Sequence, residues 1–312
     1  MNNEDLKQRS YIEFFYLGLL GLLWGMPYAL TKIALSTIQP ISLVAGRVLL
    51  AAVALWLFVI IRRCTMPRLL DFVPAIILQG VIACVIPYTL IAYGQKTIDS
   101  GLAAILNSVT PVFVCLISSV WTRHERLTAF RWLGIAVGLG GVVLVAGATA
   151  LLGFGRTLPG QGAIVLATFS SALSAIYGRR FINVAPEVTA AGTLSIATLV
   201  MVPLCLVLEQ PFHTAPSMAS LLAIGINGVA ATALGFTLYF RLIRTLGSMG
   251  VASVGYLKPG FGVLIACTFL DERLTWPMIG GLIAILAGVA ILNQRAAERE
   301  TAPRIGLDAR AA

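Results

Sequence analysis

Apolar residues occupy most of the chain in long runs, and short polar or charged segments separate these runs. A helix needs roughly 20 apolar residues to cross about 30 Å of hydrocarbon, and ten runs approach that length. We therefore predict an all-α integral membrane protein with ten transmembrane helices. The expected spans are 12–35, 40–61, 72–94, 100–120, 128–149, 160–182, 187–208, 217–240, 249–270 and 275–293.

Composition agrees with this pattern and narrows the class of protein. Hydrophobic residues make up 58% of the 312 residues and charged residues only 11%, whereas soluble domains carry about 25% charged residues. The net charge of +9 does not indicate a nucleic-acid partner, because the basic residues fall in short loops and form no stripe with interleaved aromatic residues. Scattered cysteines and two distant histidines predict no metal or cofactor site.

The basic residues of the loops predict the orientation in the membrane. Sixteen Lys and Arg residues fall on the side that includes both termini, whereas the other side has only Lys96, Arg156 and Arg273. Because cytoplasmic loops carry the excess of Lys and Arg, both termini are expected in the cytoplasm and the protein in the cytoplasmic (inner) membrane. A miscounted span would destroy this asymmetry.

An internal repeat divides the chain into two halves. The segments ERLTAFRWLGIAVGLGGVVLV, from Glu125, and ERLTWPMIGGLIAILAGVAIL, from Glu272, share residues at an offset of 147. We predict a first five-helix repeat in 1–152 (spans about 12–149), a linker at 153–159, a second repeat at 160–293 and a polar cytoplasmic tail at 294–312. Five spans in each half place the halves in inverted orientation, as in many secondary transporters. Both glutamates are interpreted as structural.

The chain resembles the drug/metabolite transporter superfamily, in particular its ten-helix group called EamA. The resemblance covers about residues 12–293. It depends on LLWGMPYALTK in the first span, RVLLAAVAL in the second, and the in-membrane Pro111 and Pro259, each followed by ERLT and a glycine-rich last helix. It implies a central cavity, with the last helix of each half more peripheral, and a role in moving metabolites, often amino acids, frequently as an exporter. The chain departs from the family at His124 and Lys258.

Lys258 is the strongest candidate for the substrate site. It lies in the apolar run VASVGYLKPGFGVLIACTFL, about nine residues into its span. At 1.5 Å per residue this is roughly 14 Å deep, where a lysine costs about 2.5–3.5 kcal/mol. Because Pro259 cannot donate a backbone hydrogen bond, we expect an opened turn that lines a cavity. Lys258 either holds an anionic group of the substrate there or caps carbonyl groups freed in neighbouring helices.

Other residues could line the same cavity. The predicted substrate-binding set joins Lys258 to eight residues: Trp24, Tyr88, Asn107, Pro111, Asn227, Tyr256, Pro259 and Gly260. For the aromatic residues, ordinary packing is the alternative. Lys32 and Arg47 are expected near the outer ends of their spans, where they either pair with carbonyls or form a vestibule for anions. Ser170, Ser171 and Ser174 are interpreted as hydrogen-bonding links between helices.

These observations favour a secondary transporter of a small organic solute, an amino acid or an organic anion, that works by alternating access and exports its substrate. Import, exchange, or a nucleotide-sugar or phosphorylated substrate remain alternatives. An integral membrane enzyme is less consistent with the sequence, because no carboxylates or histidines gather near one interface. A small-molecule substrate and the lipid bilayer are the expected partners. Nothing in the sequence requires more than a monomer.

Overall fold

The computed structural model describes residues 3–64, 73–121, 129–152, 155–181, 183–213, 215–252 and 254–301. Within these ranges the regular structure is entirely helical. Seven helices are long and apolar enough to cross a membrane, and each coincides with a predicted span: Ile12–Ala34, Pro40–Ile61, Val73–Gly94, Ser100–Ser119, Leu158–Phe181, Pro186–Leu208 and Met218–Tyr239. Three shorter apolar helices, Trp132–Gly147, Val254–Phe269 and Trp276–Leu292, lie in the remaining predicted spans.

Two of the spans in the first half are composite. The elements are α1 (Asn3–Ala34), α2 (Pro40–Ile61), α3 (Val73–Gly80), the π-helix η2 (Val81–Val85), α4 (Ile86–Gly94), α5 (Ser100–Asn107), α6 (Thr110–Trp121) and α7 (Ala129–Leu152). The third span therefore contains a π-helical segment, and the fourth is interrupted at Ser108 and Val109. Such π-helical segments are rare and frequently occur at functional sites.

The second half repeats the π-helical interruption. Its elements are α8 (Leu158–Tyr177), η3 (Gly178–Phe181), α9 (Pro186–Leu208), η4 (Pro211–His213), α10 (Met218–Ile226), the π-helix η5 (Asn227–Leu234), α11 (Gly235–Ala252), α12 (Val254–Phe269) and α13 (Trp276–Thr301). The eighth predicted span, like the third, thus contains a π-helix.

Two glutamates from distant segments cap the starts of α2 and α5. Glu209 accepts hydrogen bonds from the backbone N–H groups of Ile41 (3.0 Å) and Ser42 (2.6 Å). Glu272 accepts from those of Ser100 and Gly101, both at 2.8 Å. The first N–H groups of a helix have no partner within the helix and carry partial positive charge, so a carboxylate stabilises them. The structural interpretation of Glu272 is confirmed, whereas Glu125 lies outside the described residues.

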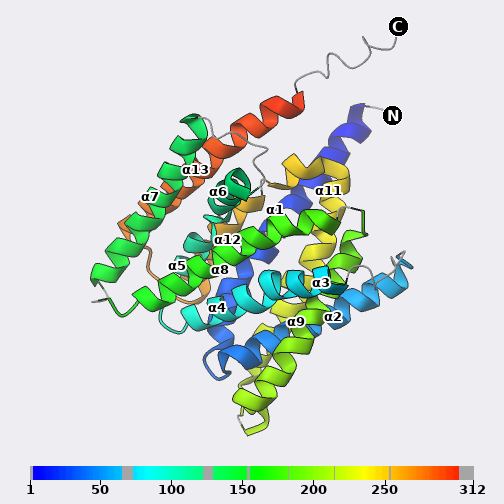
Figure 1. Ribbon diagram of the computed structural model, residues 1–312, viewed down its shortest axis with the longest axis vertical. Coiled ribbons are helices and arrows are strands. Elements are labelled where there is room, and N and C mark those ends of the chain that lie inside the picture. Colours follow the sequence, from blue (N-terminus) through cyan, green and yellow to red (C-terminus); the bar gives the residue numbers. More distant parts are fainter. Residues whose placement is uncertain are drawn as a thin grey trace.

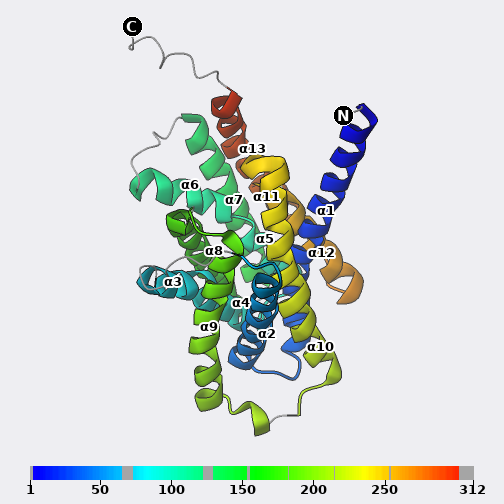
Figure 2. The same ribbon diagram turned by 90° about the vertical axis from the view of Figure 1, so that its right-hand side faces the viewer.

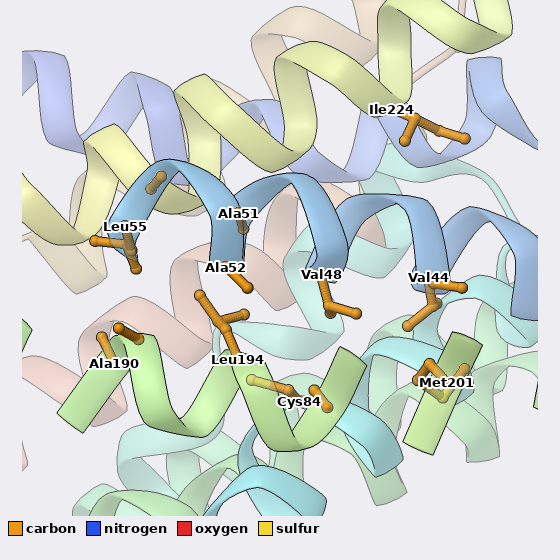
Figure 3. Close-up of a cluster of buried hydrophobic side chains, with 14 of the residues drawn as sticks. Val44, Val48, Ala51, Ala52, Leu55, Cys84, Ala190, Leu194, Met201 and Ile224 are labelled. Carbon is orange, nitrogen blue, oxygen red and sulfur yellow. The ribbon is translucent and has the colours of Figure 1, made fainter. Parts of the chain in front are cut away.

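The buried hydrophobic residues form two large clusters. In the first, which we term the α2–α9 cluster, one face of α2 packs along α9, with Leu55 against Ala190 and Leu194 (Figure 3). The second, the α5–α12 cluster, joins Leu102–Leu106 of α5 to buried residues of α7, α8, α12 and α13. Each cluster therefore combines helices from both halves of the chain.

Helices α7 and α13 pack along each other at one edge of the molecule (Figure 1). Glycines allow their backbones to approach closely. A Cβ added at Gly288 would lie 2.6 Å from the carbonyl oxygen of Gly134, and one added at Gly141 would lie 2.8 Å from that of Gly281. Small residues at such contacts are typical of membrane helix pairs.

Two helices differ from the expectation. Helix α12 continues through Pro259, where we expected an opened turn. The missing N–H of Pro259 leaves the carbonyl of Gly255 without its intrahelical partner, and the helix continues despite this loss. Helix α11 extends to Ala252 and so includes the predicted connection between the eighth and ninth spans. The interruption of a span by non-helical residues instead lies between α5 and α6.

The start of α1 and the end of α13 lie at the same end of the molecule (Figures 1 and 2). An even number of crossings produces this arrangement. Which side of the membrane this end faces stays a prediction from the loop charges.

Candidate functional site

A cavity of about 150 Å³ lies inside the bundle. Its lining comes from both halves of the chain, from α1, α2, α4, α5, α8, η5, α11 and α12. Four of the residues predicted for the substrate site line it, namely Trp24, Tyr88, Asn107 and Lys258. Both hydrophobic clusters contribute helices to this lining, with α2 from one and α5 and α12 from the other.

Asn107 connects two polar groups of the cavity lining, Lys258 and Tyr28, to Thr168 of α8. Its side-chain oxygen Oδ1 accepts hydrogen bonds from Lys258 Nζ at 2.8 Å and from the hydroxyl of Tyr28 at 2.7 Å. Its Nδ2 donates to Thr168 Oγ1 at 3.2 Å. Because Asn107 is the last residue of α5, the interruption of the fourth span directs this amide into the cavity. The ammonium of Lys258 is therefore hydrogen-bonded to a neutral amide and not to a carboxylate.

Arg47 contributes a second cation to the same cavity, and the sequence interpretation of this residue is wrong. We expected it near the outer end of its span, but its side chain is buried, with 8% of its surface exposed. The guanidinium carbon lies 4.0 Å from the centre of the Tyr88 ring, and Nε donates to Thr232 Oγ1 at 3.2 Å. A charged residue within the apolar run RVLLAAVAL was the available signal. The π-helix η5, which supplies Thr232, has no evident signature in the sequence.

Aromatic and aliphatic side chains complete the cavity. Trp24 packs against Phe236 and Tyr239, with ring centres 6.2 and 5.2 Å apart. Tyr28 also lies beside Lys258, whose Nζ is 5.6 Å from the ring centre. Tyr28 is a lining residue that the sequence reasoning missed, since tyrosines within apolar runs commonly serve only in packing.

The structure does not bring the other five predicted site residues into the cavity lining. Asn227 is buried and donates to Thr31 Oγ1 at 3.4 Å. Pro259 is buried one residue after Lys258, whereas Gly260 lies on the exposed face of α12. Tyr256 packs against the α5–α12 cluster, and Pro111 is partly buried in the first turn of α6.

Lys32 and the serines of α8 have mainly structural contacts. Lys32 donates to the backbone carbonyls of Gln95 (3.0 Å) and Ile98 (2.7 Å), which confirms pairing with carbonyls. Ser170 donates to the carbonyl of Ile82 at 2.8 Å, and Ser174 accepts from Gln79 at 3.0 Å, which confirms that they link helices. Ser171 bonds within its own helix and also lines the cavity.

The charge of the cavity determines what it can bind. Among the lining residues that the structure describes, Arg47 and Lys258 are basic and none is acidic. Two positive charges in a medium of low dielectric constant repel each other and favour an anion between them. The hydroxyl and amide groups nearby can donate further hydrogen bonds, and the aromatic side can contact carbon atoms.

Apolar helices of membrane-spanning length around an internal, solute-sized cavity define a multi-pass integral membrane protein. Comparison with known families identifies the group: the chain belongs to the EamA-like transporter family, whose model matches residues 12–147 and 158–294. The class predicted from the motifs is thereby confirmed.

Several relatives support this membership. The chain is 23% identical over 269 residues to the uncharacterized inner membrane transporter YedA of Escherichia coli K12, which covers 85% of this chain and 86% of the relative. It is 26% identical over 270 residues to the uncharacterized transporter YdfC of Bacillus subtilis, covering 84% and 85%. A probable terminal-alkyne amino-acid exporter of Streptantibioticus cattleyicolor is 26% identical over 276 residues, covering 87% and 90%.

A solved structure shows the same fold. A protein chain of known crystal structure superimposes with a TM-score of 0.62 at 20% sequence identity. The match covers 91% of this chain and 97% of that chain. At this level of identity the likeness concerns the fold alone.

Proposed function

We propose that this protein is a secondary transporter that carries a small organic solute, an amino acid or an organic anion, out of the cell by alternating access. The observation that carries the proposal is the internal cavity in which Lys258 and Arg47 lie without a lining carboxylate among the described residues. An intramembrane ionisable residue marks a substrate or ion pathway by default. In this proposal Lys258 contributes positive charge and a hydrogen-bond donor to the binding of the anionic solute.

The proposed architecture has ten transmembrane helices, arranged as two inverted repeats of five. The two separate matches to the family model and the π-helices at equivalent places in the third and eighth spans are consistent with it. Inverted repeats allow one half to exchange conformation with the other around a site near the midplane. Both termini would then face the cytoplasm.

The size of the cavity favours a small solute over a nucleotide-sugar. A cavity of about 150 Å³ is comparable to an engineered protein cavity that holds one benzene molecule. A nucleotide-sugar has several times as many atoms. Export is favoured because a relative of similar length is named a probable exporter.

Transport by purified protein in liposomes tests the proposal. A panel of amino acids and small organic anions is supplied with and without a pH gradient, and their movement is measured for wild type and Lys258→Met. Methionine fills a similar volume without charge, and Lys258 is hydrogen-bonded to a neutral amide, so the substitution leaves no described carboxylate unpaired. Because a hydrogen bond to a charged group contributes about 1.5–3 kcal/mol, the apparent KM of the variant should rise about tenfold to a hundredfold.

Lys96→Ala is the matched control, since Lys96 is an exposed loop lysine and its loss should leave the KM unchanged. Movement of no solute by wild type would refute the transport function. Wild-type KM and rate for Lys258→Met would instead refute the role of Lys258 and leave transport intact.

A further inference from the structure

Arg47 has a different environment from every other cation in the described part of the chain. It is more than nine-tenths buried, and its Nε donates to Thr232 Oγ1. Thr232 in turn donates to the backbone carbonyl of Asn227 at 2.8 Å, so η5 fixes the acceptor. Tyr88 holds the plane of the guanidinium from one face. These contacts fix the orientation of the side chain but use only one of its N–H groups.

The two terminal amino groups of Arg47 have no protein acceptor among the residues that the structure describes. The side chain makes one hydrogen bond, and no carboxylate of this part of the chain lies within ion-pair distance. A guanidinium presents five N–H donors in a planar fork. A buried cation without a counter-ion is costly, and a cation–π contact compensates only part of that cost. Because Arg47 lines the cavity, an anion inside the cavity can pair with its guanidinium.

Lys258 differs from Arg47 because its ammonium already has an acceptor. Nζ donates to Asn107 Oδ1, which also accepts from Tyr28. A ligand must compete with the Asn107 amide for Lys258. Among the described residues, no acceptor competes for the terminal amino groups of Arg47. Arg47 of α2 therefore has more N–H donors available to an anion in the cavity than Lys258 has.

We propose that Arg47 is the primary anchor for the substrate carboxylate, and that the pocket selects small carboxylic acids that lack a free amino group. This inference deepens the proposed transport function and rests on it. The fork of Arg47 binds the carboxylate through two parallel hydrogen bonds, a geometry that an ammonium cannot reproduce. Lys258, with Asn107 and Tyr28, binds a second oxygen of the solute, such as a 2-oxo, 2-hydroxy or second carboxylate group.

The same cavity disfavours zwitterionic amino acids. An α-ammonium would add a third positive charge next to Arg47 and Lys258, and no lining carboxylate among the described residues offsets it. Like charges in a site of low dielectric constant are a strong element of discrimination. Replacing the ammonium by a carbonyl oxygen removes the repulsion and supplies an acceptor for Lys258. Trp24, Ile91 and Phe236 contact the carbon chain of the acid in either case.

Pairs of solutes that differ only at the second carbon test this inference. Pyruvate is compared with alanine, 4-methyl-2-oxopentanoate with leucine, and phenylpyruvate with phenylalanine, on the full-length protein. Binding is measured by the ligand-induced rise in the thermal unfolding midpoint in detergent, and transport is measured with labelled solutes in liposomes. We expect each oxo acid to bind at least tenfold more tightly than its amino acid.

Two substitutions examine Arg47 directly. Arg47→Lys keeps the charge but lacks the fork, and Arg47→Gln removes the charge; both should weaken oxo-acid binding on the order of tenfold or more. Thr232→Val offers an independent route if the Arg47 variants fail to fold, because it keeps Arg47 and removes the hydroxyl that orients Nε, together with the hydrogen bond of that hydroxyl to the Asn227 carbonyl. Thr232→Ser restores that hydroxyl and should restore binding. Lys96→Ala is the control.

The outcomes separate the inference from the proposed function. Transport of amino acids as effective as that of their oxo acids, or unchanged affinity in Arg47→Lys, overturns the inference while transport stands. Arg47-dependent binding of oxo acids without transport supports the anion site and overturns the transport function. Absence of both binding and transport for all six solutes overturns the inference, and the broader solute panel then decides the function.

Discussion

At the scale of single residues, Asp99 is a carboxylate placed to respond to pH. It precedes α5 at the N-cap position, in the loop between two candidate spans. Partial burial raises its pKa, the neighbouring Glu272 carboxylate raises it further, and Lys32 opposes the shift. Glu272 and Lys32 are themselves engaged with the backbone of the same loop and helix start. The protonated form of Asp99 is therefore favoured by the fold.

The substitution Asp99→Asn tests this shift. Since the native state binds the proton of Asp99 more tightly than the unfolded state, the contribution of Asp99 to stability falls as the pH rises through the raised native pKa. Asparagine is an equally good N-cap residue. The thermal unfolding midpoint of the variant in detergent should exceed that of wild type at neutral pH. The difference should vanish below about pH 4, the ordinary pKa of an aspartate. A difference that does not depend on pH would contradict the assignment.

The sequence revealed only one of the two cations in the cavity as a site residue. Lys258 was identifiable because a lysine in the middle of an apolar run requires compensation wherever it points. Arg47 lies only seven residues into α2, a depth that also suits snorkelling to the interface. Its real environment depends on Tyr88 and Thr232, which are distant in sequence, and a one-dimensional pattern does not contain that information.

At the scale of elements, hydrophobic run length located the helices well. The seven long candidate spans match the predicted ones, because the need to satisfy backbone groups in lipid leaves helices as the solution for such runs. Interruptions within spans were less predictable. Pro259 is accommodated inside α12, whereas Pro111 follows shortly after the interruption between α5 and α6, and Pro87 shortly after the π-helix η2. The π-helix η5 has no proline within it. Such features depend on the contacts that neighbouring helices make.

The packing of α7 against α13 gives a prediction at this scale. Gly141→Ala would place a Cβ 2.8 Å from the carbonyl oxygen of Gly281 and 2.9 Å from Ile285 Cγ1. Overpacking of this kind typically costs about 1–3 kcal/mol, so the thermal midpoint in detergent should fall. Gly140→Ala is the matched control, because a Cβ there meets no atom within 4 Å and alanine favours the helix. Equal midpoints for the two variants would show that this contact is absent.

At the scale of the whole molecule, the proposed inverted repeat of five and five helices makes a prediction about topology. Ten crossings with a cytoplasmic N-terminus return the C-terminus to the cytoplasm, in agreement with the shared end at which α1 starts and α13 finishes (Figure 2). A fluorescent protein fused to the C-terminus should be fluorescent, whereas alkaline phosphatase fused within the 153–159 linker should be active. Active phosphatase at the C-terminus would mean that the number of crossings is odd.

The two cations of the cavity extend from helices that pack in different hydrophobic clusters. Arg47 extends from the α2–α9 cluster and Lys258 from a helix of the α5–α12 cluster. If the proposed anion site is correct, a dicarboxylate long enough to reach both cations would connect the two clusters, while a shorter acid would leave them free to move apart. The carbon-chain length of the solute would then set not only how tightly it binds but also which conformations the loaded protein can reach.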